Sequence, residues 1–192
     1  MKKVIIALSM LCLINSVNAA SISWTTGIIR LADGTTPALG CAVYLFDIAT
    51  PYNSTDFASF SAELEAAIKG GTFLTGGYDA LAVLDGKTNP SGTAPEGALA
   101  GKSNIAMGEG PWASGQVKTL FMVVFDAGDY DSADKFQLTT GITKTLGSAT
   151  QTFGFGTEGL LQPGNWEGIP EPATMALVGV GIVALGLRRR RK

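Results

Sequence analysis

The chain has 192 residues, of which 25 are glycine and none is histidine. The lack of histidine excludes Ser-His-Asp and Cys-His catalysis and any histidine-ligated metal site. Residues 20–172 hold all 16 acidic residues but only seven of the 14 basic ones, and seven minus 16 gives this part a net charge of −9. Such an acidic surface repels nucleic acid, so we expect no nucleic-acid partner.

Residues 1–19 have the pattern of a secretory signal peptide. Two lysines follow the first methionine, residues 4–14 are apolar, and small residues precede the expected cleavage site. We therefore expect the chain to be exported, with cleavage after Ala19; cleavage after Ala20 also fits the pattern.

Residues 20–158 are predicted to form one exported β-rich domain. Short apolar or alternating runs are separated by glycine, proline and aspartate, which is typical of strands joined by turns. Strands are expected at residues 22–28, 41–46, 78–84, 117–125, 136–142 and 153–155, with one further short edge strand within 98–107. The run at 117–125 is apolar on both faces and should lie in the middle of a sheet. The pattern favours a mainly β fold, an antiparallel β-sandwich or a barrel-like domain with one short helix.

The single cysteine outside the signal peptide is Cys41, so no disulfide bond within the exported part is possible. It opens an apolar run, which favours a buried small side chain. A reactive thiol or a bridge to another molecule is the alternative.

The short helix is expected to follow Asp56, which is a suitable N-cap. Four apolar residues from Phe57 to Ile68 recur at spacings of three, four and four, and they define one face of a helix. Glu63 and Glu65 are predicted to point away from that face toward water. A Gly-Gly pair then ends the helix.

Four carboxylates lie within nine residues, between two predicted strands. They repel one another, and a hard cation such as Ca²⁺ would relieve the repulsion. The glycine and glutamate that an EF-hand requires are missing, so the alternative is an acidic turn whose side chains cap backbone amides. We expect no cofactor other than this candidate calcium, whose ligands would be Asp126, Asp129, Asp131 and Asp134.

Two other functions stay open. A carbohydrate-binding module would stack exposed aromatic rings on sugars, and the candidates are Trp24, Trp112, Trp166, Tyr52, Tyr78 and Tyr130. A surface hydrolase would need two carboxylates facing each other across a sugar cleft, and the candidates are Asp47, Asp79, Asp85, Glu109 and Asp126. No spacing selects a pair, so we assign no catalytic residue and expect no enzymatic activity.

The end of the chain has the pattern of a membrane anchor. Residues 159–172 are rich in glycine and proline and are predicted to be a linker. Residues 173–187 carry no charge, and as a helix they would be roughly 22 Å long. Such a helix can insert when flanking side chains reach the interface. The cations that follow cannot cross the bilayer, so residues 173–192 are predicted to be a transmembrane segment with a cytoplasmic basic tail.

Three features coincide at this terminus: the Pro170-Glu171-Pro172 motif, the apolar segment, and a basic cluster that contains Arg188, Arg189, Arg190 and Arg191. Together they resemble a PEP-CTERM sorting signal, whereas the body resembles no family. The resemblance implies that an exosortase, a membrane protease-transpeptidase, recognises the Pro-Glu-Pro region and removes the tail.

The resemblance also implies a location. We expect an exported structural or interaction protein that is first anchored in the inner membrane by its C-terminal helix. After processing it would reach the cell surface or an extracellular matrix, where exopolysaccharide is a candidate partner.

Overall fold

The computed structural model describes residues 21–48, 57–99, 105–106, 112–156 and 161–170. The predicted signal peptide and the predicted transmembrane segment lie outside these residues. Within the described ranges, no helix combines the length and apolar character that a membrane span requires.

The strands are β1 (Ser21–Thr25), β2 (Ala42–Asp47), β3 (Leu84–Lys87), β4 (Ile105–Ala106), β5 (Val117–Phe125), β6 (Lys135–Leu138), β7 (Ile142–Thr145), β8 (Gln151–Gly154) and β9 (Glu167–Gly168). The helices are α2 (Phe57–Lys69) and the short 3-10 helices η1 (Asp79–Leu81) and η3 (Pro163–Asn165).

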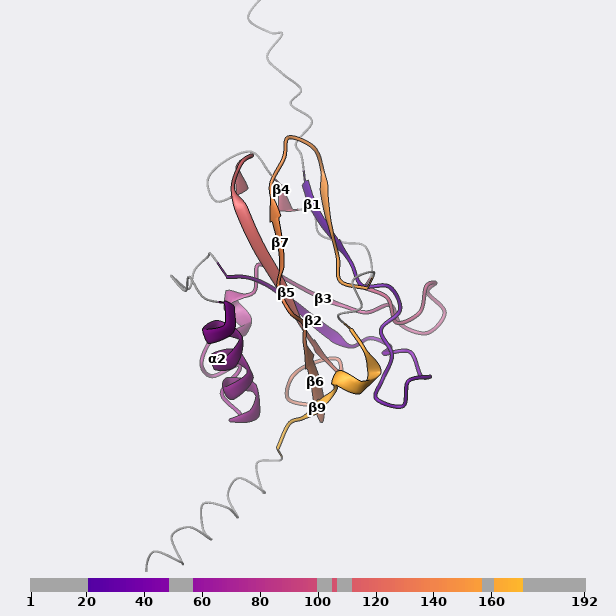
Figure 1. Cartoon of the computed structure of the whole chain (residues 1–192). Helices are drawn as coiled ribbons and strands as arrows, with labels where there is room; N and C mark the ends of the chain where they lie inside the picture. Colours follow the sequence, from indigo (N-terminus) through magenta and orange to yellow (C-terminus); the bar gives the residue numbers. More distant parts are fainter. Residues whose placement is uncertain (1–20, 49–56, 100–104, 107–111, 157–160, 171–192) are drawn as a thin grey trace, which may run out of the picture.

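A central antiparallel sheet is built around β5 (Figure 1). Its strand order is β3-β2-β5-β6-β9, and β7 pairs with the first half of β5 on the same side as β6. The nine residues of β5 are long enough to hold β6 and β7 one after the other. The prediction of a mid-sheet strand at 117–125 is therefore confirmed.

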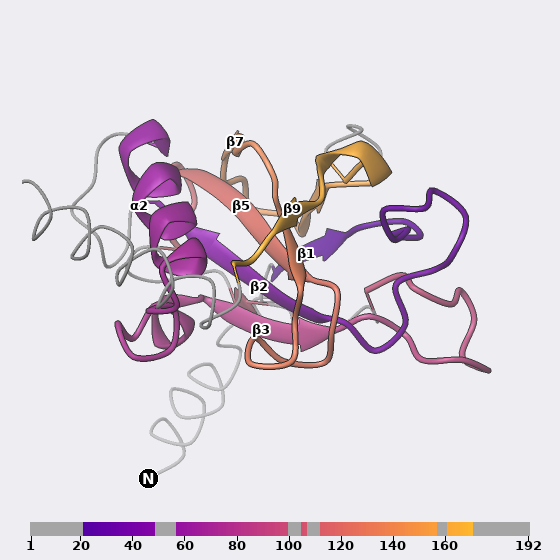
Figure 2. The same ribbon diagram turned by 90° about the horizontal axis from the view of Figure 1, so that it is seen from below.

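The side chains of β5 divide the interior into two cores, because alternate residues of a strand point to opposite faces. Phe121, Val123 and Phe125 point into one core, which we call the helix core since the buried residues Phe60, Leu64 and Ile68 of α2 cover it. Leu120, Met122 and Val124 point into the other, which we call the sheet core. Figure 2 shows α2 and β1 on opposite sides of the central strands.

The sheet core is closed by a second, three-stranded sheet with the order β4-β1-β8. Ile22 and Trp24 of β1 and Phe153 of β8 are buried in it. β1 pairs with β8 in parallel, so the antiparallel prediction fails for this one pairing and holds for the others between described strands. Both sheets are open in the described part of the chain. The prediction of a mainly β, largely antiparallel fold with one short helix is therefore confirmed, and the described strands form no closed barrel.

The predicted strand at 136–142 is wrong in two respects. It is divided into β6 and β7, because Thr139 uses its side-chain oxygen as well as its backbone to bond Met122. Its alternation of apolar and polar residues also predicts one solvent-exposed face, and this is wrong since Gln137 and Thr139 are both buried. The central sheet is covered on both faces, so polar residues that alternate with apolar ones still lie inside.

The predicted strand at 78–84 is also misplaced. The chain forms η1 at this point, and strand β3 begins only at Leu84. Asp85-Gly86 is a typical turn sequence and predicts the end of that strand, but the two residues pair with Tyr44 and Val43 at the edge of the sheet. By contrast the helix prediction is confirmed: α2 begins at Phe57, and its apolar face is buried. The predicted cap Asp56 lies outside the described residues.

Candidate functional site

The candidate site is the last described stretch of the chain, which leads into the Pro-Glu-Pro motif. Residues 161–170, which we call the C-terminal segment, lie within the predicted linker but are packed on the domain. Their strand β9 pairs antiparallel with β6, with Lys135 opposite Gly168 and Phe136 opposite Glu167. Figure 1 shows β9 beside β6 at the lower end of the sheet. The segment thereby forms the last strand of the central sheet.

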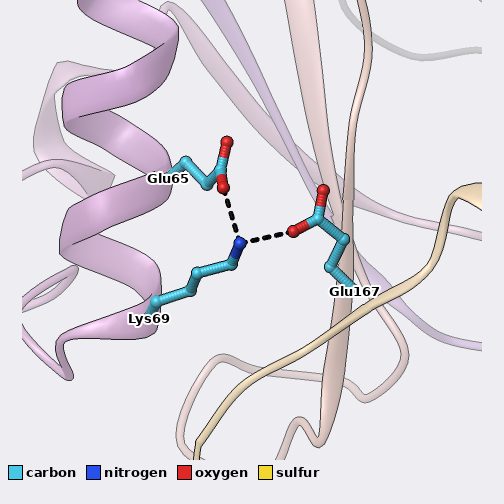
Figure 3. A network of polar contacts seen from close by, with 3 residues as sticks. All are labelled: Glu65, Lys69 and Glu167. Atoms are coloured by element: carbon cyan, nitrogen blue, oxygen red, sulfur yellow. Dashed lines mark hydrogen bonds and ion pairs between the residues drawn. The ribbon is translucent and has the colours of Figure 1, made fainter.

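A lysine at the end of α2 bridges the helix to this strand (Figure 3). The Lys69 ammonium lies 2.5 Å from a carboxylate oxygen of Glu65 and 2.5 Å from one of Glu167. These hydrogen bonds, the one to Glu167 above all, raise the pKa of Lys69. The side chains are 37%, 38% and 50% exposed, for Lys69, Glu65 and Glu167 respectively. Each pair therefore contributes at most about 1 kcal/mol.

Two apolar side chains fix the segment on either side of the sheet edge. Trp166 packs against the sheet core, and its indole N–H donates to the backbone oxygen of Arg30 at 2.8 Å. Ile169 packs against the helix core, and its amide donates to the backbone oxygen of Asp134 at 2.8 Å. Pro170 follows directly and is half-buried. Pro170, the first residue of the Pro-Glu-Pro motif, thus directly follows the last backbone hydrogen bond that the described part of the segment makes with the domain.

The rest of the predicted sorting signal lies outside the described residues: Glu171, Pro172, Arg188, Arg189, Arg190 and Arg191. What the structure describes is therefore the domain side of the signal. It consists of an edge strand and two apolar anchors directly upstream of Pro170, with an ion-pair network that joins the strand to α2.

Residues 168–191 match the family model of the PEP-CTERM protein-sorting motif. The match confirms the resemblance, and it begins at Gly168, inside β9. The motif is a recognition signal for exosortase. The chain therefore has the sorting signal of a protein that is exported and sorted at the membrane. No curated protein and no solved structure matches the chain. The body upstream of Gly168 thus has no functional assignment from these comparisons.

The predicted calcium ligands lie on the turn between β5 and β6. Asp126 accepts hydrogen bonds from the amides of Asp134 and Lys135 at 3.0 and 2.9 Å. Asp129 accepts one from the amide of Ser132 at 2.9 Å, and its hydrogen bonds with Ser132 lower its pKa. Two of the four carboxylates therefore cap backbone amides. Within the described ranges no group of three or more metal-ligating side chains has the geometry of a metal site. Calcium binding stays a prediction.

The candidate sugar-stacking aromatics are not exposed where the structure describes them. Trp24 and Tyr130 are buried in the two cores. Trp112, Trp166 and Tyr78 are half-buried; Trp112 packs on the sheet core, and Tyr78 packs on the helix core. Tyr52 lies outside the described residues. A flat exposed row of rings, which the carbohydrate-binding hypothesis requires, is therefore missing from the described surface.

The candidate hydrolase carboxylates are dispersed over the domain. Asp47 lies inside the protein, 2.6 Å from the ammonium of Lys118. Asp79 is half-buried in η1, and Asp85 is exposed on β3. Together with burial, which is the larger cause, these two charges raise the pKa of Tyr44. Asp126 caps the turn described above, and Glu109 lies outside the described residues.

Sequence reasoning missed Lys69 and Glu167. One signal was present, because Glu65 and Lys69 have the spacing of an ion pair within one helix. The expectation that the helix acids face water was too simple: Glu65 binds Lys69, and Glu63 accepts a hydrogen bond from the hydroxyl of Tyr78 at 2.7 Å. Nothing local marks Glu167 as a partner, since its contact with Lys69 depends on the docking of β9.

Proposed function

We propose that this protein is a structural or interaction protein, without enzymatic activity of its own, that exosortase sorts to the cell surface or the extracellular matrix. The observation that carries the proposal is the sorting-motif match at residues 168–191. The fold adds that the body is packed up to Ile169, so the matched signal begins within the last strand of a folded domain.

The proposal includes a two-stage location. Export through the signal peptide at residues 1–19 leaves the chain held in the inner membrane by residues 173–192, with the basic cluster in the cytoplasm. Cleavage near Pro170 to Pro172 then separates the domain from this anchor. The negative charge of the body favours solubility and suits a hydrated matrix of polysaccharide, the candidate partner after release.

The test is the mass of the protein recovered from its own host, and from the same host without its exosortase. We expect loss of residues 1–19 and of everything after the Pro-Glu-Pro region in the first case. In the second case we expect the basic tail to be retained. A matched variant, Glu171→Gln, should reduce cleavage if this carboxylate is recognised, while Glu158→Gln, upstream of the motif, should not.

A mature protein that keeps Arg188–Arg191 in the presence of exosortase would contradict the proposal. The protein would then be a permanent membrane protein, and the matrix location would have to be withdrawn.

A further inference from the structure

The residues that lead into the sorting motif are occupied by the domain itself. β9 is paired with β6, the carboxylate of Glu167 is held by Lys69, and the amide of Ile169 donates to Asp134. A second protein cannot use the same backbone groups while these bonds exist. One edge of the chain is thus occupied up to the residue before Pro170.

Enzymes and binding proteins that read peptides commonly take them as extended chains, through main-chain hydrogen bonds along several residues. An exosortase that binds the Pro-Glu-Pro region in this way would also need the backbone just upstream of Pro170. That backbone is in β9 and Ile169. An enzyme that encloses the extended chain needs both of its edges, so it cannot bind these residues while one edge is paired with β6.

We infer that residues 166–169 act as a clasp that must leave the domain before exosortase cuts, so that clasp stability sets how readily the chain is sorted. This inference rests on the proposed function. The clasp is held by few contacts, a two-residue edge strand and an ion pair that is largely exposed. Such segments open locally at a low cost in free energy. Apparent affinity for the enzyme falls with the fraction of open molecules.

A reversible lock tests the inference directly. Lys135 and Gly168 are Cα partners across β6 and β9, and neighbouring strands place such residues at a separation that suits a disulfide bond. Lys135 is exposed, and a Cβ atom at Gly168 would meet no atom of the described residues within 4 Å. The double variant Lys135→Cys/Gly168→Cys should therefore form the bond without disturbing the fold. The native Cys41 is buried and stays out of the reaction.

The measurement is the rate of tail removal from the full-length chain in membranes that contain exosortase, with and without a reductant. We expect the oxidised double variant to be cut at least about tenfold more slowly than the reduced one, because the open fraction falls. The single variants Lys135→Cys and Gly168→Cys report any effect of the substitutions themselves. Equal rates for the oxidised and reduced forms would overturn the inference.

A second pair of variants loosens the clasp instead. Glu167→Gln removes the charge that joins β9 to Lys69, and we expect cleavage to become about two- to fivefold faster. Glu65→Gln is the matched control, since it also removes one partner of Lys69 but leaves the bond to β9. Slower cleavage of Glu167→Gln, with Glu65→Gln unchanged, would mean that the docked segment presents the motif, and the inference would fail.

The two proposals fail in different ways. If exosortase does not cut the unmodified chain at all, the sorting function fails. If it cuts the unmodified chain and cuts the oxidised lock equally fast, sorting stands and the clasp alone is wrong.

Discussion

The carboxylate of Asp47 and the ammonium of Lys118 lie 2.6 Å apart, with side chains that are 0% and 3% exposed. They come from adjacent strands, β2 and β5, and the Lys118 nitrogen also lies 4.3 Å from the ring centre of Trp112. Trp112 thus covers the charge as an anchoring side chain of its loop. A polar pair so fully removed from water makes the stability of this end of the sheet depend on both partners.

Loss of either partner should destabilise the fold strongly. Lys118→Met or Asp47→Leu alone leaves one charge buried without its counterion, and we expect each to lower the free energy of unfolding by about 3–5 kcal/mol. The double variant removes both charges and should recover much of that loss. Urea unfolding followed by circular dichroism measures the three values. Single variants that cost less than about 1 kcal/mol would show that water reaches the pair.

At Gln137, by contrast, a substitution should stabilise the protein. Its side chain is 1% exposed, and neither its amide nitrogen nor its amide oxygen has a hydrogen-bond partner among the residues that the structure describes. A buried polar group without a partner costs about 1–3 kcal/mol. Gln137→Met keeps the shape and should therefore stabilise the protein by about 1 kcal/mol.

The control for this substitution is Gln116→Met, because Gln116 is exposed and the change there should have little effect on the midpoint of urea unfolding. If Gln137→Met destabilises the protein instead, a buried water bonded to the amide is the physical explanation.

The parts of this fold that sequence could predict are those with a local signature. Apolar residues on both faces predict β5, and the spacing of apolar residues from Phe57 to Ile68 predicts α2. The sequence also marks the sorting signal, because its three features lie within one short stretch. In each case the residues that form the feature are close neighbours in the chain.

The remaining features depend on distant contacts. Asp47 and Lys118 are 71 positions apart, and Trp166 binds the backbone of Arg30 across 136 positions. No local pattern reveals such pairs. Gln137 was misjudged for the same reason, since its alternating pattern fits a sheet with one solvent-exposed face, and only the tertiary structure shows that Gln137 is buried.

Cys41 should be unreactive in the folded protein. Burial, and to a smaller extent the charge of Asp126, raises the pKa of its thiol from 9.0 to about 11. At pH 8 roughly one molecule in a thousand would carry a thiolate. We expect iodoacetamide to label the exported protein only in denaturant. Rapid labelling of the native protein at pH 8 would contradict the burial of this side chain.

The same shift predicts how stability depends on pH. The folded state holds the thiol proton more tightly than the unfolded state, so the stability contribution is fully present below pH 9 and is lost as the pH rises through about 11. Three tyrosines with raised pKa values act in the same direction. Comparison with Cys41→Ala across this range isolates the thiol, and identical pH profiles would show that it does not contribute.

The junction of β1 and β8 depends on a glycine without a side chain. A Cβ atom at Gly156 would lie 1.9 Å from the backbone oxygen of Thr26, far inside van der Waals contact. The neighbouring backbone cannot move freely, because the Thr26 hydroxyl oxygen accepts from the amide of Leu99 at 2.9 Å and Thr26 is buried. Gly156→Ala should therefore cost about 3 kcal/mol or more.

Gly164 provides the matched control for this last substitution. A Cβ atom there meets nothing within 4 Å, so Gly164→Ala should change stability by no more than about 0.5 kcal/mol. Thermal unfolding of the two variants and the parent protein measures the difference. Because Gly156 follows the parallel pairing of β1 with β8, a large loss at Gly156 alone would support that pairing, the one the antiparallel prediction missed. Equal midpoints for both variants would mean that the two strands do not approach each other in this way.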